Sequence, residues 1–181
     1  MIKAVTTRDK LINAARTLFW TRGYSNVSVR DITGAAGVDA ALVSRYFGGK
    51  QGLFEATLAE IPPWEALAAN PEDLLAKAAE SFAHPFDPEA DAANVFTMLI
   101  ANVIDPEMGG TIRETVQQQL ADPLAEKIGG AHAQDRAAAL LAVLFGMALM
   151  RKNFQTKALA QKSPDALRTQ IMRLGLAALE T

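Results

Sequence analysis

Residues 28–47 decide the fold, and they carry the sequence SVRDITGAAGVDAALVSRYF. Ser28 begins a Ser-x-x-Asp pattern with Asp31, which is typical of a capping box at a helix N-terminus. Gly37 is typical of a helix end, and Asp39 begins a second, short helix as its N-cap. The pattern therefore predicts two helices joined by a glycine turn. Four apolar residues have the spacing to hold these helices together: Ile32, Val38, Val43 and Phe47.

Helical periodicity extends in both directions from this segment. Apolar residues recur at three- and four-residue spacing, and strand patterns are nearly absent, so we predict an all-α fold. A first helix should end at Gly23, and a fourth should run from Lys50 to near Glu60. Further helices are predicted at about 72–83, 88–104, 106–128, 133–156 and 164–179. We predict a head at residues 1–50 and a helical body at residues 51–181.

Charge is distributed unevenly along the 181 residues, whose net charge is −2. Residues 1–50 contain eight Lys or Arg against three Asp, whereas the rest of the chain contains ten basic against seventeen acidic residues. A basic head on an acidic body fits a polyanion that binds at one end. A helix-turn-helix in that head fits the major groove of DNA, although a plain helical hairpin shares the pattern.

Composition excludes several other classes of protein. Half of the residues are hydrophobic and there is no cysteine, so disulfides, thiol catalysis and cysteine-based zinc sites are excluded. Residues 1–10 lack the apolar core of a secretory signal. The longest apolar stretch, residues 137–150, is too short to span a bilayer. We therefore expect a cytoplasmic protein with no membrane partner.

Catalytic and metal-binding patterns are missing. His84 and His132 each lack a second ligand at metal-binding spacing, and Lys50 after two glycines lacks the spacing of a phosphate-binding loop. We expect no enzyme activity, no metal and no cofactor. A helical protein-interaction module is an alternative, but residues 28–50 show no broad apolar stripe for a protein partner.

Residues 8–58 resemble the tetracycline-repressor (TetR) family of bacterial regulators. The resemblance lies in segments that match in order and spacing: residues 11–15 (LINAA), 18–19 (LF), 23–24 (GY), 27–32 (VSVRDI), 36–38 (AGV), 42–47 (LVSRYF) and 50–54 (KQGLF). Three positions depart from the family pattern. Ser44 stands where an aromatic residue is usual, Leu42 replaces a common Thr, and Gly49 replaces a Ser or Asn cap.

The resemblance implies a homodimer that binds a palindromic operator in double-stranded DNA. Ser28, Arg30, Tyr46 and Lys50 would contact the phosphate backbone. Five positions would face the bases: Ala40, Ala41, Leu42, Ser44 and Arg45. We predict that Ala41 or Leu42 contacts thymine methyl groups and that Arg45 contacts guanine.

The body resembles the family's ligand-binding and dimerisation domain. Its last two long helices would pair with their twins, through interface candidates Leu141, Phe145, Ala148, Leu167, Ile171 and Leu174. An apolar cavity would bind a small-molecule inducer and release the repressor, with lining candidates Phe82, Phe96, Met98, Ile100, Asn102, Arg113, Val116, Met147 and Phe154. A constitutive regulator with a filled core remains an alternative.

Overall fold

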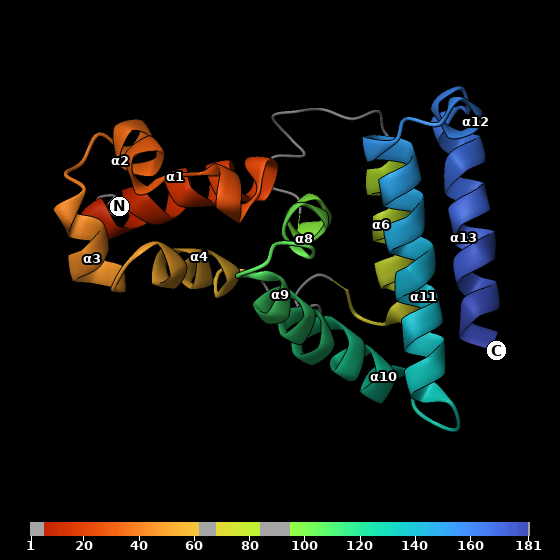
Figure 1. Cartoon of the computed structure of the whole chain (residues 1–181). Coiled ribbons are helices and arrows are strands. Elements are labelled where there is room, and N and C mark those ends of the chain that lie inside the picture. Colours follow the sequence, from red (N-terminus) through yellow and green to blue (C-terminus); the bar gives the residue numbers. More distant parts are fainter. Residues whose placement is uncertain (1–5, 62–67, 84–94, 181) are drawn as a thin grey trace, which may run out of the picture. The chain divides into compact units, whose positions relative to one another are not determined.

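The computed structural model describes residues 6–61, 68–83 and 95–180, apart from the side chains of Phe96 and Thr97. Within these ranges the chain forms helices and no strand, which confirms the all-α prediction (Figure 1). Contacts group the chain into two compact units. Unit 1 comprises residues 1–61 and 88–113, and unit 2 comprises residues 62–87 and 114–181.

Unit 1 contains the predicted head. Its helices are α1 (Thr7–Arg22), a 3-10 turn (Tyr24–Asn26), α2 (Val29–Ala36), α3 (Ala41–Phe47) and α4 (Lys50–Leu58). Helix α1 packs against α2 and α4, and α3 packs against α4. Fully or almost fully buried side chains form the core between them: Leu11, Ile12, Phe19, Trp20, Val27, Ile32, Val43, Leu53 and Phe54.

Unit 1 also contains a segment that the sequence analysis assigns to the body. Helix α8 (Val95–Asn102) packs against α1, and α9 (Gly109–Val116) begins in the same unit. The predicted border after residue 50 does not follow this contact grouping. The division at residue 50 remains a prediction, in which residues 1–50 would bind DNA and residues 51–181 would bind the ligand and form the dimer.

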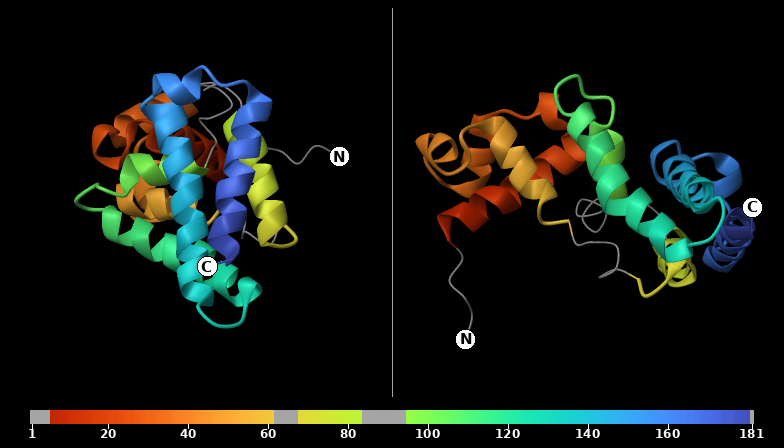
Figure 2. Two further views of the ribbon diagram at one scale, coloured as in Figure 1. Left: turned by 90° about the vertical axis from the view of Figure 1, so that its right-hand side faces the viewer. Right: turned by 90° about the horizontal axis from the view of Figure 1, so that it is seen from below.

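Unit 2 is a bundle whose central pair is α11 (Ala133–Ala148) and α13 (Pro164–Glu180). Helix α13 also packs against α6 (Pro71–Ala83), and α10 (Asp122–Ile128) packs against α11. Figure 2 shows α11 and α13 side by side, with α6 next to α13. A short helix, α12 (Lys157–Ala160), lies between α11 and α13 in the chain.

Two predicted long helices contain π-helical turns. Helix α9 continues through Gln117–Ala121 into α10, and α11 continues into Leu149–Asn153. The first of these two continuous helices begins at Gly109, whereas the sequence predicts its start at residue 106. The side chain of Asp105 accepts hydrogen bonds from the backbone N–H groups of Glu107 and Met108, at 3.0 and 3.1 Å, and so begins the turn at residues 106–108 that precedes α9.

The segment Ala133–Asn153 is 21 residues long and apolar enough to cross a membrane by length and composition alone. The helix is longer than the apolar stretch of residues 137–150. The shortness of that stretch therefore does not exclude a membrane span. However, the segment carries Arg136, Arg151 and Lys152, and it packs against the other helices of unit 2. One such helix is weak evidence for a membrane span, and 28% of its most apolar window is buried within the chain.

The contact between α13 and α6 requires a glycine. A Cβ atom at Gly175 would lie 2.3 Å from Cδ1 of Leu75, whose side chain is fully buried. We predict that Gly175→Val destabilises unit 2 by about 2 kcal/mol, because overpacking a closed core displaces its neighbours. Thermal unfolding followed by circular dichroism measures this loss. Adding Leu75→Ala should cost less than the sum of the two single changes, whereas strict additivity would show that the two residues do not touch.

The corner between α3 and α4 also requires a glycine. A Cβ atom at Gly52 would lie 2.0 Å from the backbone oxygen of Phe47. We predict that Gly52→Ala lowers the free energy of unfolding by about 3 kcal/mol in urea titrations, since backbone must move. Gly34→Ala is the matched control: no atom lies within 4 Å of its Cβ position, so helix propensity should raise stability by up to about 1 kcal/mol. Equal effects of the two changes would contradict this geometry.

Candidate nucleic-acid interface

The helix-turn-helix is built from local hydrogen bonds that its sequence predicts. Ser28 Oγ accepts a hydrogen bond from the Asp31 N–H at 3.1 Å, and Asp31 Oδ2 accepts from the Ser28 N–H at 2.8 Å. This is a complete capping box, which confirms the prediction. The Ser28 hydroxyl also donates to the Asp31 carboxylate, and these bonds lower the pKa of Asp31. The cap therefore remains ionised at neutral pH.

Local hydrogen bonds also form the turn and the start of α3, the second helix of the motif, which we call the recognition helix. Gly37 adopts the left-handed conformation, with φ of 66° and ψ of 39°, and ends α2. Asp39 Oδ1 accepts a hydrogen bond from the Ala41 N–H at 2.7 Å, so Asp39 caps the helix as predicted, although regular α3 geometry begins two residues later. Ile32 and Val43 are buried, whereas Val38 and Phe47 are half-buried.

The residues predicted to face bases lie on an exposed surface of α3. Ala40, Ala41, Ser44 and Arg45 are exposed, and Leu42 is half-buried. Tyr46 is 43% exposed, which is unusual for a large aromatic side chain of a folded head. The structure thus brings the predicted contact positions of α3 together on one short helix that is open to solvent on that side.

The head carries three cationic side chains near the motif, two of them close to the C-terminal end of α3. Arg30 is exposed in the first turn of α2. Lys50, at the start of α4, places Nζ 4.0 Å from the ring centroid of Tyr24. Arg8, in the first turn of α1, places its guanidinium carbon 5.3 Å from the ring centroid of Phe47. The sequence analysis did not select Arg8, because nothing in the sequence spacing pairs it with a residue 39 positions later.

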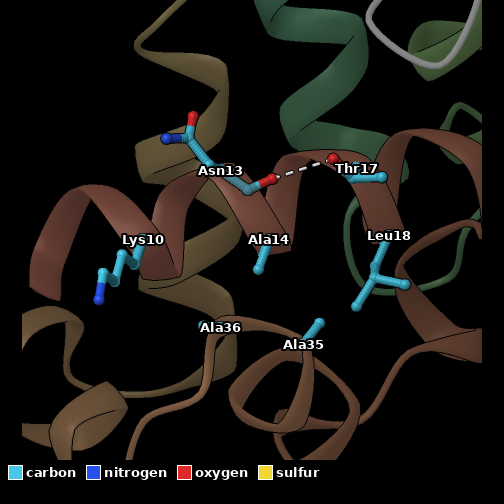
Figure 3. Close-up of a pocket in the computed structure, with 7 residues that line it drawn as sticks. All are labelled: Lys10, Asn13, Ala14, Thr17, Leu18, Ala35 and Ala36. Carbon is cyan, nitrogen blue, oxygen red and sulfur yellow. Dashed lines mark hydrogen bonds between the residues drawn. The ribbon is translucent and has the colours of Figure 1, made fainter. Parts of the chain in front are cut away.

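An open groove runs between α1 and α2 in the same head. Figure 3 shows the residues that line it: Lys10, Asn13, Ala14, Thr17, Leu18, Ala35 and Ala36. Its walls are mainly apolar, and Thr17 donates a hydrogen bond from its hydroxyl to the backbone oxygen of Asn13 at 3.1 Å. None of the predicted DNA-contacting residues lines this groove, so it is separate from the α3 surface.

The predicted ligand-cavity residues are divided between the two units. Met98, Ile100, Asn102 and Arg113 belong to unit 1, whereas Phe82, Val116, Met147 and Phe154 belong to unit 2. Phe82 and Met98 are fully buried, but Phe154 is 66% exposed and lines no closed cavity. The side chain of Phe96 lies outside the described residues. The three half-buried members of the set are Ile100, Val116 and Met147.

Two polar residues predicted as ligand anchors have hydrogen-bond partners within unit 1. Asn102 is fully buried and uses both its amide oxygen and its amide nitrogen in hydrogen bonds within unit 1. Arg113 is exposed and donates a hydrogen bond from Nη1 to the backbone oxygen of Val103 at 3.2 Å. Sequence spacing alone does not distinguish an amide that bonds a ligand from one that bonds a distant turn of the same chain.

The predicted dimer residues also differ in accessibility. Leu167 and Ile171 are fully buried, and Leu141 and Ala148 are 7% and 3% exposed, so these four face the interior of unit 2. Their predicted role at the dimer interface remains a prediction. Phe145 is half-buried and Leu174 is 37% exposed, so these two can contact another chain.

Two family models match this chain, one in the head and one in the body. A family model described as bacterial regulatory proteins of the tetR family matches residues 11–57. A second model, described as a tetracyclin repressor-like C-terminal domain, matches residues 72–174. The chain is 46% identical over 56 residues to a probable HTH-type transcriptional regulator, YttP, of Bacillus subtilis (strain 168). That alignment covers 31% of this chain and 27% of the relative, so the chain matches about a quarter of the relative's length.

Solved structures share the fold over nearly the full length. Native NalD, the secondary repressor of the MexAB-OprM multidrug efflux pump in Pseudomonas aeruginosa, has a TM-score of 0.67 at 20% identity, and 95% of each chain is covered. A TetR-like transcriptional regulator from Rhodococcus sp. RHA1 has a TM-score of 0.64 at 18% identity, with 99% of each chain covered. Because the family models match both the helix-turn-helix and most of the helical body, the chain belongs to the tetracycline-repressor (TetR) family of bacterial regulatory proteins.

Proposed function

We propose that this protein is a cytoplasmic, homodimeric repressor that binds a palindromic operator near its own gene. The observation that carries the proposal is the exposed surface of α3, with the cationic side chains of Arg8 and Lys50 near its C-terminal end. Phosphate contacts determine the orientation of such a helix on the duplex, and contacts to base edges select the sequence. Membership of a family of regulatory proteins supports this role, and we assign the chain no catalytic reaction.

The phosphate contacts are assigned to Arg30, Tyr46 and Lys50, with Arg8 as an addition from the structure. Ser28 uses its hydroxyl in the capping box, so its contribution would come from the helix N-terminus that it begins. Ala40 and Ala41 are small and exposed, which suits contact with thymine methyl groups. Arg45 is the long exposed donor of α3 and suits the acceptor edge of guanine.

Release from the operator would follow binding of a small, largely apolar ligand in the C-terminal domain. The match of residues 72–174 to a tetracyclin repressor-like C-terminal domain supports this part of the proposal. Such a ligand acts only through its different affinity for the DNA-binding and released states. A difference of about a hundredfold, or about 2.7 kcal/mol, suffices to release an operator.

The dimer surface is assigned to the outer faces of α11 and α13. Only 28% of the most apolar window of Ala133–Asn153 is buried within the chain, although the helix is mainly apolar. Ala138 and Ala142 are exposed, and Phe145 and Leu149 are half-buried; their spacing places them on one side of the helix. On α13, the apolar side chains of Leu174 and Leu176 are 37% and 41% exposed. A second copy would remove this surface from water.

We predict that Ala142→Glu converts the dimer to a monomer, because it places a carboxylate in the centre of an apolar contact. The side chain is exposed in the single chain, so the fold should persist. Sedimentation velocity measures the change in mass. Ala76→Glu is the matched control, since Ala76 is an exposed alanine of α6, and this variant should sediment like wild type. An Ala142→Glu protein that remains dimeric would place the interface elsewhere.

For DNA binding, we predict that Lys50→Ala lowers the salt slope of operator affinity by about 0.9 unit, the value for one lost phosphate contact. Tyr46→Ala should weaken binding with little change in slope, because it removes an uncharged contact. Fluorescence anisotropy at 50–200 mM salt, with a duplex selected from random sequence by the wild-type protein, measures both. Lys157→Ala, an exposed lysine of α12, is the control and should retain the wild-type slope. Equal affinity for every duplex would contradict the proposed function.

A further inference from the structure

Asn102 is a fully buried amide that lies outside the helix-turn-helix and is bonded to the head. Its Oδ1 accepts a hydrogen bond from the backbone N–H of Tyr24 at 2.7 Å. Its Nδ2 donates to the backbone oxygens of Phe19 at 3.1 Å and Met98 at 2.8 Å. The Phe19 oxygen belongs to the last turn of α1, where carbonyl groups need donors from outside the helix, and the Tyr24 N–H lies just past that end. The last residue of α8 therefore caps the end of α1 across 78 positions of sequence.

Asp105 bonds the next residue of the same turn. Its Oδ2 accepts from the Ser25 N–H at 3.1 Å and from the Ser25 hydroxyl at 2.6 Å, while its Oδ1 accepts from the N–H groups of Glu107 and Met108, just before α9. Desolvation alone would raise the pKa of Asp105, but the hydrogen bonds from Ser25, Met108 and Glu107 outweigh it and lower the pKa. The carboxylate is thus ionised at neutral pH and holds both segments at once.

Tyr24 connects this turn to a DNA-contacting residue. Its ring is buried and lies 5.5 Å from the ring of Phe19 and 5.3 Å from that of Phe54, between centroids. The Nζ of Lys50 lies 4.0 Å from the Tyr24 ring centroid, close enough for a cation–π contact that restricts a long, flexible side chain. Burial and the carboxylate of Glu107 raise the pKa of Tyr24, so its hydroxyl stays neutral near Lys50.

These contacts form a continuous chain within unit 1. Asn102 and Asp105 hold residues 24 and 25, and Tyr24 presents its ring to Lys50. We propose that Asn102 and Asp105 are positioning residues for DNA binding, which place Lys50 for its phosphate contact through Tyr24. The inference rests on the proposed function, and it gives the segment of residues 98–108 a role in affinity for the operator.

The test measures salt dependence, because a merely structural role would not change it. A partly unfolded variant has less active protein, which lowers apparent affinity equally at every salt concentration. A variant that misplaces Lys50 loses one phosphate contact, so its slope falls by about 0.9 unit. The ratio of wild-type affinity to variant affinity should then fall about 3.5-fold between 50 and 200 mM salt.

The experiment uses the full-length protein and the duplex selected from random sequence by wild type. Asn102→Ala should lose about 0.9 unit of slope, and Asn102→Ala combined with Lys50→Ala should lose no more than Lys50→Ala alone. Asn26→Ala is the matched control. Asn26 lies in the same turn, but its amide donates a hydrogen bond to the backbone oxygen of Arg22 within the head. The salt slope of the Asn26→Ala variant should therefore equal that of wild type. Asp105→Asn serves as the second variant if Asn102→Ala does not fold.

The outcomes separate this inference from the proposed function. A wild-type protein that selects no sequence from the random pool overturns the proposed function. Specific wild-type binding with an unchanged slope in Asn102→Ala and Asp105→Asn overturns the positioning role alone. Additive loss of slope in the double variant also overturns it, since Asn102 would then act on a phosphate contact other than that of Lys50.

Discussion

Three aromatic rings packed at the centre of unit 1 determine where its functional surface lies. Phe19 stacks on Tyr24 with 5.5 Å between ring centroids, and Phe54 meets both rings edge-on at 5.3 Å. The rings come from α1, the following turn and α4. Because α2 packs on α1 and α3 packs on α4, this cluster connects the supports of both helices of the motif. Aromatic pairs in such geometry contribute energy beyond the area that they bury.

The sequence predicts the parts of the fold that depend on neighbours in the chain. The capping box of Ser28 and Asp31, the glycine end at Gly37 and the cap at Asp39 are all found in the structure. Each involves groups no more than four residues apart, so the local sequence pattern is enough to predict it. The exposed positions on α3 follow from the same periodicity, since Val43 occupies its buried side.

The parts that the sequence does not predict depend on partners far along the chain. Asn102 has the residue type of a ligand anchor, and only the fold shows that it bonds groups 78 and 83 residues away. Leu167 and Ile171 have the spacing of an apolar helix face, but spacing does not reveal whether that face meets α6 in the same subunit or a second copy. The structure shows that it meets the subunit core, because both side chains are fully buried.

The few polar side chains of α3 make selection of a DNA sequence depend on how the head is positioned on the duplex. Among its exposed positions, Ser44 and Arg45 can bond base edges, whereas Ala40 and Ala41 offer only methyl contacts. With few hydrogen-bonding groups, discrimination between bases depends on how closely these side chains approach the groove floor. Phosphate contacts determine that approach. A head whose turn is bonded by a buried amide and an ionised carboxylate has little freedom to shift its phosphate contacts. In the proposed mode of binding, rigid support from residues 102 and 105 would compensate for the few polar side chains of α3.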